Sequence, residues 1–458
     1  MSREPRPAFV TDENFPLVTD LYELTMAAGY LAAGRDEPAS FELFVRALPP
    51  TRSYLVVAGL EQAVHYLCHL RFGEAAIAYL RSQPVFAHAG ERFFDYLAQL
   101  RFRGDLDAMP EGTLAFAGEP LLRVAAPIVE AQIVETYLLT TLAFQTLVAT
   151  KASRVVAAAR GRAVVDFGSR RAHGPQAGVL AARAAWIGGC AGTSNVLAGR
   201  LFGLPVSGTQ AHSWVMSFES EEEAFRAYHE AFPEHSVLLL DTYDTLAAAR
   251  KATAFGPGLV GVRLDSGNLR TLSRQVRKIL DDAGMHQTRI LASGDLNEHR
   301  IDRLVRGGAA IDGFGVGTEM ATSKDAPALG CVYKLVQQRL GGRNVPRLKL
   351  SEEKETYPGR KQVFRLADRR GRFRGDAIGL EDERLGGQPL LVPVLRGGEL
   401  VSPLPTLEES RERAANGLAL LPPRFRRLED PAQYPVRWSQ RIRKLRAKMV
   451  RELQRENT

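Results

Sequence analysis

The sequence contains few cysteines and no long apolar run. Its 458 residues include three cysteines, and their wide separation and odd number argue against a disulfide framework and against a Cys-based metal site. This usage is typical of a reducing compartment, so we expect a cytoplasmic protein. No run of about 18 apolar residues is present, which argues against a membrane helix. The polar N-terminal stretch MSREPRPAFVTDENFP lacks the apolar segment of a secretory signal.

Basic residues outnumber acidic ones, 60 to 52, which gives a net charge of +8. Much of the excess lies in residues 437–454, RWSQRIRKLRAKMVRELQ, where apolar residues recur at helical spacing. This pattern predicts a terminal amphipathic helix with a solvated basic face, and a nucleic-acid-binding arm is the alternative. The rest of the chain shows no basic stripe with interleaved aromatic residues, so no nucleic-acid partner is expected.

Three regions differ in their pattern. Residues 1–130 mix amphipathic helices, such as 61–70 and 91–102, with short strands punctuated by Gly and Pro, which is typical of an α+β domain. Residues 131–335 alternate strand and helix six times. Residues 336–458 contain hairpin patterns with Gly-containing turns, followed by the basic helix. The alternation predicts parallel strands with crossover helices, either a doubly wound sheet or a β/α barrel. The six expected strands are RAVVDFG, LPVSGTQ, SVLLLDTY, LVGVRLDS, RILASGD and AIDGFGVGT.

Polar residues and glycines follow every one of these strands. Ligands of α/β folds bind at the carboxyl ends of the strands, so these residues are the candidate site. Arg suits carboxylate or phosphate oxygens, and Gly followed by a helix brings backbone N–H groups to an anion. Asp suits ribose hydroxyls or Mg²⁺ on a polyphosphate. The set predicts a small, multiply anionic substrate; singly, each Asp is as readily a helix cap and each Arg an ion pair. The candidates are Asp166, Ser169, Arg170, Arg171, His173, Thr209, His212, Ser213, Asp241, Asp244, Arg263, Asp265, Ser266, Ser293, Gly294, Asp295, Asn297, Gly315, Gly317 and Thr318.

His212 follows a strand end in the segment GTQAHS. A histidine there is a candidate acid, base or phosphoryl acceptor, although a lone histidine is more often structural. No second His lies at metal-ligand spacing, which argues against zinc. A sugar-phosphate aldolase or isomerase is an alternative enzyme class, but the strand ends offer no Lys for a Schiff base.

Several long motifs resemble the nicotinate phosphoribosyltransferase family in order and over nearly the whole chain. They are LVTDLYELTMAAGY, FELFVRALPPTRSYLVVAGLEQAV, DFGSRRAHG, GTSNVLAGRLFGLPVSGTQAHSW, LLLDTYDT, GVRLDSGNL, ILASGDLNE, GFGVGTEMATSKDAPALGCVYKLV and KLSEEKETYPGRKQVFR. The resemblance implies an irregular β/α-barrel core beside an α+β domain built from the N- and C-terminal segments. It also implies a homodimer.

The same resemblance implies the reaction and the residue roles. Nicotinate and phosphoribosyl diphosphate would give nicotinate mononucleotide and diphosphate, coupled to ATP hydrolysis with Mg²⁺ as cofactor, in NAD biosynthesis by salvage. His212 would be the phosphorylated histidine, with Arg263 and Asp265 also in catalytic roles. Tyr22 would stack on the pyridine ring, and Thr209 and Arg263 would hold its carboxylate. The phosphoribosyl diphosphate contacts would be Arg170, Ser293, Gly294, Asp295, Gly315, Gly317 and Thr318.

Three points stay open within this resemblance. No side chain is assigned to a metal, although Asp265 or Asp295 are candidates through Mg-diphosphate. Nicotinamide or quinolinate are alternative acceptors. Asn297 stands where the family pattern more often has Asp, which affects only the expected role of that side chain.

Overall fold

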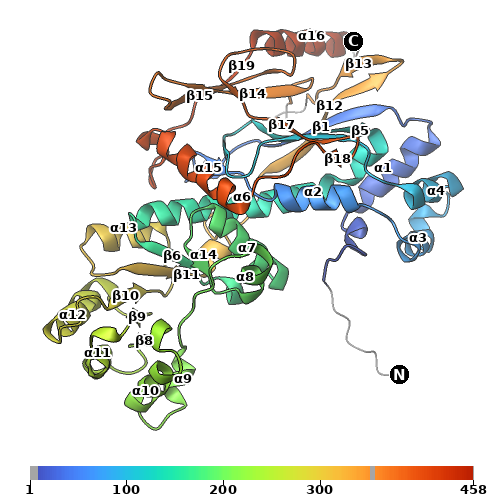
Figure 1. Cartoon of the computed structure of the whole chain (residues 1–458). Helices are drawn as coiled ribbons and strands as arrows, with labels where there is room; N and C mark the ends of the chain where they lie inside the picture. Colours follow the sequence, from blue (N-terminus) through green and yellow to red (C-terminus); the bar gives the residue numbers. More distant parts are fainter. Residues whose placement is uncertain (1–8, 351–355, 457–458) are drawn as a thin grey trace, which may run out of the picture. The chain divides into compact units, whose positions relative to one another are not determined.

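The computed structural model describes residues 9–350 and 356–456 (Figure 1). The chain divides into two compact units. One consists of the chain up to Thr146 together with the chain from Ala328, and the other is Leu147–Pro327. The domain boundaries expected near residues 130 and 335 stay predictions. Residues 351–355 of the KLSEEKETYPGRKQVFR motif lie outside the described residues.

The first unit is built around a seven-stranded antiparallel sheet of order β13-β12-β1-β5-β3-β17-β18. The inner strand β1 pairs with β5 on one side and with β12 on the other, so early and late parts of the chain share one sheet. Alternate β1 residues such as Leu43 and Val45 are fully buried in the main hydrophobic core. The strands are β1 (Pro38–Val45), β3 (Asp105–Ala108), β5 (Pro120–Pro127), β12 (Cys331–Leu340), β13 (Arg343–Pro346), β17 (Val392–Arg396) and β18 (Glu399–Leu400).

Helices and two smaller sheets complete this unit. Helix α5 packs against β1 and β5, and α1 packs on α5. The helices predicted at 61–70 and 91–102 are confirmed as α2 and α4. Ile442 on the last helix is fully buried while most of its basic residues are exposed, as the amphipathic pattern predicts. The helices are α1 (Leu21–Ala32), α2 (Leu60–His69), α3 (Glu74–Arg81), α4 (Glu91–Gln99), α5 (Ile128–Ile133), α15 (Leu407–Leu420) and α16 (Gln440–Glu456), and the small sheets are β2 (Leu55–Val56) with β4 (Leu114–Ala115), and β14 (Lys361–Ala367), β15 (Phe373–Leu380), β16 (Gln388–Pro389) and β19 (Val436–Trp438). Helix α6 (Glu135–Ala159) belongs to this unit up to Thr146 and to the second unit from Leu147.

The second unit contains a six-stranded sheet of order β7-β6-β11-β10-β9-β8, in which every pair is parallel. This confirms the parallel α/β arrangement that the alternation predicts. The strands are short and buried, as expected for strands covered on both faces. They are β6 (Ala163–Asp166), β7 (Gly192–Thr193), β8 (Val237–Leu239), β9 (Gly261–Leu264), β10 (Arg289–Ala292) and β11 (Gly313–Val316), and the helices are α7 (Pro175–Ile187), α8 (Val196–Phe202), α9 (His212–Met216), α10 (Glu221–Ala231), α11 (Thr245–Ala252), α12 (Leu269–Asp282), α13 (Glu298–Arg306) and α14 (Thr318–Ala321).

One expected strand is wrong. The segment LPVSGTQ makes only an isolated parallel bridge, between Val206 and Thr193, and the strand at this edge is β7 instead. Val206 is more than half exposed, and Pro205 before it has no N–H to donate to a second neighbour. The residues after Val206 therefore form a loop that leads into α9 and His212.

No helix of the described residues is both long and apolar enough to cross a membrane.

Candidate active site

A cavity of about 550 Å³ lies in the second unit at the carboxyl ends of its strands. Side chains and backbone from five strand ends line it, and it contains every site residue that the family resemblance implies except Tyr22. These are Arg170, Thr209, His212, Arg263, Asp265, Ser293, Gly294, Asp295, Gly315, Gly317 and Thr318. Residues separated by up to about 150 positions therefore meet in one space, as the strand-end rule predicts.

The loops after β9 and β10 are locked to each other. Ser293 donates a hydrogen bond from its hydroxyl to Asp265 Oδ1. Gly294 has a φ of +86°, and a Cβ built on it would lie 1.8 Å from the Asp265 carbonyl oxygen. Asp295 has a φ of +46°, a left-handed conformation that non-glycine residues rarely adopt. This close approach and strain hold two acidic residues at the rim of one cavity.

Asn297 has a structural explanation. Its side-chain oxygen accepts a hydrogen bond of 2.9 Å from the backbone N–H of Arg300, which makes it the N-cap of α13. Asp and Asn cap helices about equally well, so the departure from the family pattern leaves the start of this helix intact.

His212 is the first residue of α9 and faces two polar groups. Its Nδ1 lies 3.1 Å from the Thr242 hydroxyl, and its Nε2 lies 4.0 Å from Asp265 Oδ2. The ring is partly exposed to the cavity, so an incoming group can reach it. Thr242 fixes the orientation of the ring, and it is a contact that the sequence reasoning missed.

Arg263 projects from β9 and is largely buried. Its guanidinium donates to the Thr209 hydroxyl and lies 4.0 Å from Asp265 Oδ1. Burial lowers the pKa of Arg263, while Asp265 and Asp241 oppose this shift and Arg170 adds to it. The arginine nonetheless stays charged, since arginine is not deprotonated in proteins. Arg263 and Thr209 thus form a joint donor site for an anion.

Gly168, just after β6, and Gly315, in β11, allow neighbouring segments to approach closely. A Cβ on Gly315 would lie 2.3 Å from the ring of Phe167, and one on Gly168 would lie 2.4 Å from the Cβ of Ala321. Phe167 also lines the cavity. It belongs to the DFGSRRAHG motif, but no pattern in the sequence marks it as a residue of the site.

Several strand-end candidates serve local structure. Asp166 is buried and accepts hydrogen bonds from Thr193, at 2.8 Å, and from the Gly168 N–H, at 2.9 Å. Burial raises its pKa, and these two bonds oppose the shift. Asp244 caps α11 by accepting from the Ala247 N–H at 2.6 Å.

Tyr22 belongs to the other unit, on α1. It is about half exposed, and partial burial together with the charges of Glu135 and Glu23 raises the pKa of its phenol. The phenol is therefore neutral at physiological pH, and its ring is accessible for stacking.

The described residues offer few side-chain ligands for a metal ion in this cavity. In the described part of the chain no group of three or more His, Cys, Asp or Glu residues is placed to hold a metal ion. Asp265 and Asp295 nevertheless line the cavity, and the neighbouring Asp241 Oδ1 is buried without a hydrogen-bond partner. One or two carboxylates are what Mg²⁺ uses when a substrate diphosphate supplies further oxygens. The residues present fit Mg²⁺ held with its substrate.

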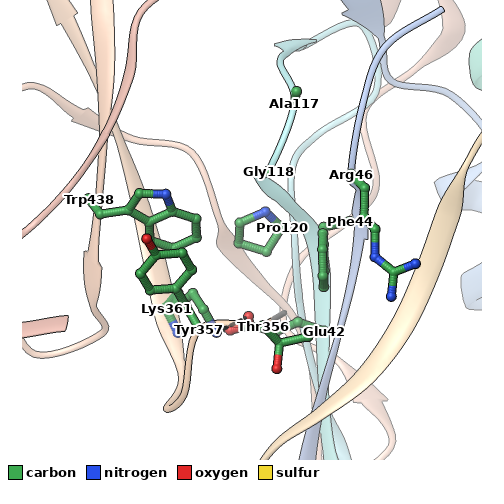
Figure 2. Close-up of a pocket in the computed structure, with 10 residues that line it drawn as sticks. All are labelled: Glu42, Phe44, Arg46, Ala117, Gly118, Pro120, Thr356, Tyr357, Lys361 and Trp438. Atoms are coloured by element: carbon green, nitrogen blue, oxygen red, sulfur yellow. Dashed lines mark hydrogen bonds and ion pairs between the residues drawn. The ribbon is translucent and has the colours of Figure 1, made fainter. Parts of the chain in front are cut away.

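A second cavity, of about 510 Å³, lies in the first unit (Figure 2). Tyr357 and Trp438 stack along one side with ring centroids 3.7 Å apart, and Lys361 pairs with Glu42 at 2.7 Å. None of the candidate site residues lines this cavity.

Known protein families and characterised proteins match most of this chain. Models of the nicotinate phosphoribosyltransferase N-terminal domain, family and C-terminal domain match residues 17–143, 162–344 and 386–446. A nicotinate phosphoribosyltransferase of Mycobacterium tuberculosis is 47% identical over 93% of this chain and 92% of its own length. The chain belongs to the nicotinate phosphoribosyltransferase family. This confirms the predicted family and enzyme class.

Two further relatives support this assignment. A nicotinate phosphoribosyltransferase of Bacillus subtilis is 40% identical over 97% of this chain and 99% of its own length. The crystal structure of the human nicotinic acid phosphoribosyltransferase matches with a TM-score of 0.83 and 34% identity, and the match covers 93% of this chain and 99% of that one. The match to the family therefore includes both units.

Proposed function

We propose that the cavity of the second unit transfers the phosphoribosyl group of phosphoribosyl diphosphate to the ring nitrogen of nicotinate. The products are nicotinate mononucleotide and diphosphate, the transfer is coupled to ATP hydrolysis, and the pathway is NAD biosynthesis by salvage. The observation that carries this proposal is the convergence of Arg263 and Thr209 with the acidic and glycine-rich loops in one cavity.

The residues suit the charges of this reaction. Arg263 and Thr209 bind the nicotinate carboxylate, because a guanidinium fork and a hydroxyl match its two oxygens. Backbone N–H groups near Gly315, Gly317 and Thr318 bind the 5′-phosphate where a side chain would collide. The nicotinate nitrogen is already nucleophilic, so the chain has to orient the ring and needs no general base.

Charge builds on the leaving diphosphate as the bond to the ribose carbon breaks. Asp265 and Asp295 are the side chains that would hold Mg²⁺ with its substrate, and such an ion would supply positive charge to neutralise the leaving group. Arg170 lies in the same cavity and stabilises the same oxygens, while Ser293 and Gly294 keep the two acidic loops in place. These groups stabilise the transition state by fixed electrostatics.

In this proposal an imidazole nitrogen of His212 bonds to the γ-phosphorus of ATP and ADP leaves; water later cleaves the phosphohistidine to inorganic phosphate and restores His212. Phosphorylation adds about two negative charges and strong acceptor oxygens. Because Asp265 lies 4.0 Å away, the new phosphate and this carboxylate together attract Mg²⁺ and Arg side chains. Phosphorylation therefore orders the loops around the substrate and tightens its binding.

The proposal includes an irregular β/α barrel as the core. The strand order β7-β6-β11-β10-β9-β8 follows the chain cyclically, with the first strand β6 beside the last strand β11. The bridge from Thr193 to Val206 extends the sheet at the β7 edge. Cyclic order supports a barrel over a doubly wound sheet, whose strand order reverses at a switch point.

We further propose a cytoplasmic homodimer in which Tyr22 stacks on the pyridine ring, with no nucleic-acid or membrane partner. Its domains are 1–130, 131–335 and 336–458, the last packing with the first. The pairing of β1 with β12 supports this packing, since both segments contribute to one sheet. Exposure of the Tyr22 ring supports its role in stacking.

The test is product formation by the purified protein from phosphoribosyl diphosphate and Mg²⁺, with nicotinate, nicotinamide or quinolinate, each with and without ATP. We expect nicotinate mononucleotide from nicotinate alone, with turnover increased by ATP. His212→Asn keeps the size and hydrogen bonding of the side chain, and we expect it to abolish the ATP stimulation. Product from another acceptor, or retained stimulation in His212→Asn, would contradict the respective assignment.

A further inference from the structure

A buried group of charges lies behind the candidate site, within the second unit. Lys151 on α6 is almost fully buried, and three carboxylates surround its ammonium. Its Nζ lies 2.7 Å from Glu298 Oε2, 2.8 Å from Asp325 Oδ1 and 3.3 Å from Glu319 Oε2. Arg154, one turn further along α6, pairs with Glu298 at 3.0 Å.

The three carboxylates come from the two segments that follow β10 and β11 and that carry the proposed phosphate ligands. Glu298 is the first residue of α13, directly after the segment Ser293–Asn297. Glu319 follows Thr318 and itself lines the cavity, and Asp325 ends the turn after α14. In the described part of the chain, Lys151 contacts carboxylates of both segments, Glu298 after β10 and Glu319 and Asp325 after β11.

Both loops contain backbone that needs external support. Asp295 and Ser323 are two of the four non-glycine residues with positive φ in the described chain, at +46° and +45°. Each such residue costs about 1–3 kcal/mol and persists where its surroundings fix it. Asp295 lies three residues before Glu298, and Ser323 lies between Glu319 and Asp325.

The charges of this cluster are balanced. Lys324 contacts Glu319 at 3.5 Å, so three cations face three carboxylates. Burial opposes ionisation of Glu298, but Lys151 and Arg154 overcome this and lower its pKa. The removal of one buried member therefore leaves an oppositely charged neighbour without compensation.

We propose that Lys151 is a positioning residue that sets the spacing between the loop after β10 and the loop after β11, and so fixes the subsites for phosphoribosyl diphosphate. Lys151 is buried and does not line the cavity. It acts through Glu298 and Glu319 and touches no substrate. This inference rests on the proposed function for the identity of the ligand, but not for the link between the loops.

The experiment compares the wild type with Lys151→Met, Lys151→Arg and Arg154→Met in the full chain. Arg154→Met is the matched control, because it removes a buried cation from the same helix and the same Glu298 but leaves Lys151 between the loops. We expect Lys151→Met to raise KM for phosphoribosyl diphosphate about tenfold, equal to about 1.4 kcal/mol, with kcat within about threefold. Lys151→Arg restores a low KM, and Arg154→Met lowers the melting temperature without raising KM.

Two outcomes would overturn the proposal: an unchanged KM in Lys151→Met, or an equal rise in KM in Arg154→Met. If Lys151→Met does not fold, Glu319→Gln removes one charged end of the link and keeps its shape. We expect a roughly threefold higher KM from that variant, and an unchanged KM would again overturn the proposal.

Hydrogen exchange of the ligand-free protein separates this proposal from the proposed function. Lys151→Met should exchange faster than the wild type in both 293–298 and 317–325, whereas Arg154→Met should not do so in 317–325. If the wild type forms no product from phosphoribosyl diphosphate, the proposed function fails, and exchange still decides whether Lys151 links the loops. Unchanged exchange in both segments would refute the link itself.

Discussion

Replacement of Gly294 by Ala tests how strongly the site depends on the contact between the loops after β9 and β10. The added Cβ would lie 1.8 Å from the Asp265 carbonyl oxygen, and real Cβ contacts essentially never fall below 3.0 Å. The two loops must therefore separate by at least 1.2 Å. The left-handed conformation of Gly294 adds a cost of about 1–2 kcal/mol for any L-residue.

The expected loss follows from these two terms. A displacement of about 1 Å in a catalytic arrangement can lower the rate about 100-fold. Together with overpacking, which costs about 1–3 kcal/mol, the left-handed strain gives a destabilisation of about 2–5 kcal/mol. We expect kcat/KM to fall about 100-fold, accompanied by a lower melting temperature in differential scanning fluorimetry.

Gly284→Ala is the matched control for this variant. Gly284 has a similar positive φ of +74°, but a Cβ there meets nothing within 4 Å. It therefore carries the conformational cost alone, and we expect a modest loss of stability with unchanged kcat/KM. If Gly294→Ala keeps its activity within about threefold, or if Gly284→Ala loses as much, the reasoning from the overlap is wrong.

Two other predictions concern single charged groups. Arg263→Lys keeps the charge but loses the guanidinium fork. Because a charged hydrogen bond contributes roughly 1.5–3 kcal/mol, we expect KM for nicotinate to rise about 10- to 100-fold in steady-state kinetics. An unchanged KM would contradict the assignment of Arg263 to the nicotinate carboxylate. Burial raises the pKa of Glu23 from 4.5 to about 7, although hydrogen bonds from Thr19 and Thr136 oppose this shift. The folded protein therefore keeps a proton on Glu23 that the unfolded chain releases above pH 4.5. This contribution to stability is complete below pH 4.5 and is lost as the pH rises through 7. The side chain of Glu23→Gln stays neutral at every pH. We therefore expect the free energy of unfolding of this variant to rise by about 2 kcal/mol relative to that of the wild type between pH 5 and 8. If the melting temperatures of the two proteins change with pH in parallel, this prediction is wrong.

The α/β arrangement of the second unit could be predicted because its signals are local. Short apolar runs ending in Gly, Asp or Arg mark the strands, and the rule that ligands bind at strand ends places Arg263, Asp265 and Asp295 together. The strand β7 could not be predicted, because its two residues, Gly192 and Thr193, carry no periodicity. The sequence predicts a strand at LPVSGTQ instead, because a short apolar run next to Gly has the same pattern whether or not it pairs with a neighbouring strand.

Contacts between residues that lie far apart along the chain could not be predicted from the sequence. Thr242 supports His212 from the loop after a different strand, and nothing at position 242 marks it as a partner. Lys151 lies in a helix of mixed composition, and only the fold brings it within reach of Glu298 and Glu319. Tyr22 differs from both, since its expected role comes from the family resemblance and no local pattern indicates it.

The division of the chain also sets the order in which its parts can fold during synthesis. The second unit is one continuous stretch and is complete once Pro327 has been made. The first unit is not, because Val45 of the inner strand β1 pairs with Cys331, and Pro393 pairs with Asp107. While the second unit is being made, β1 therefore waits with one edge unpaired, and an unpaired edge is a site for aggregation. The N-terminal third of this protein is thus synthesised first but completes its sheet last, and we expect it to be exposed to aggregation for longest during synthesis.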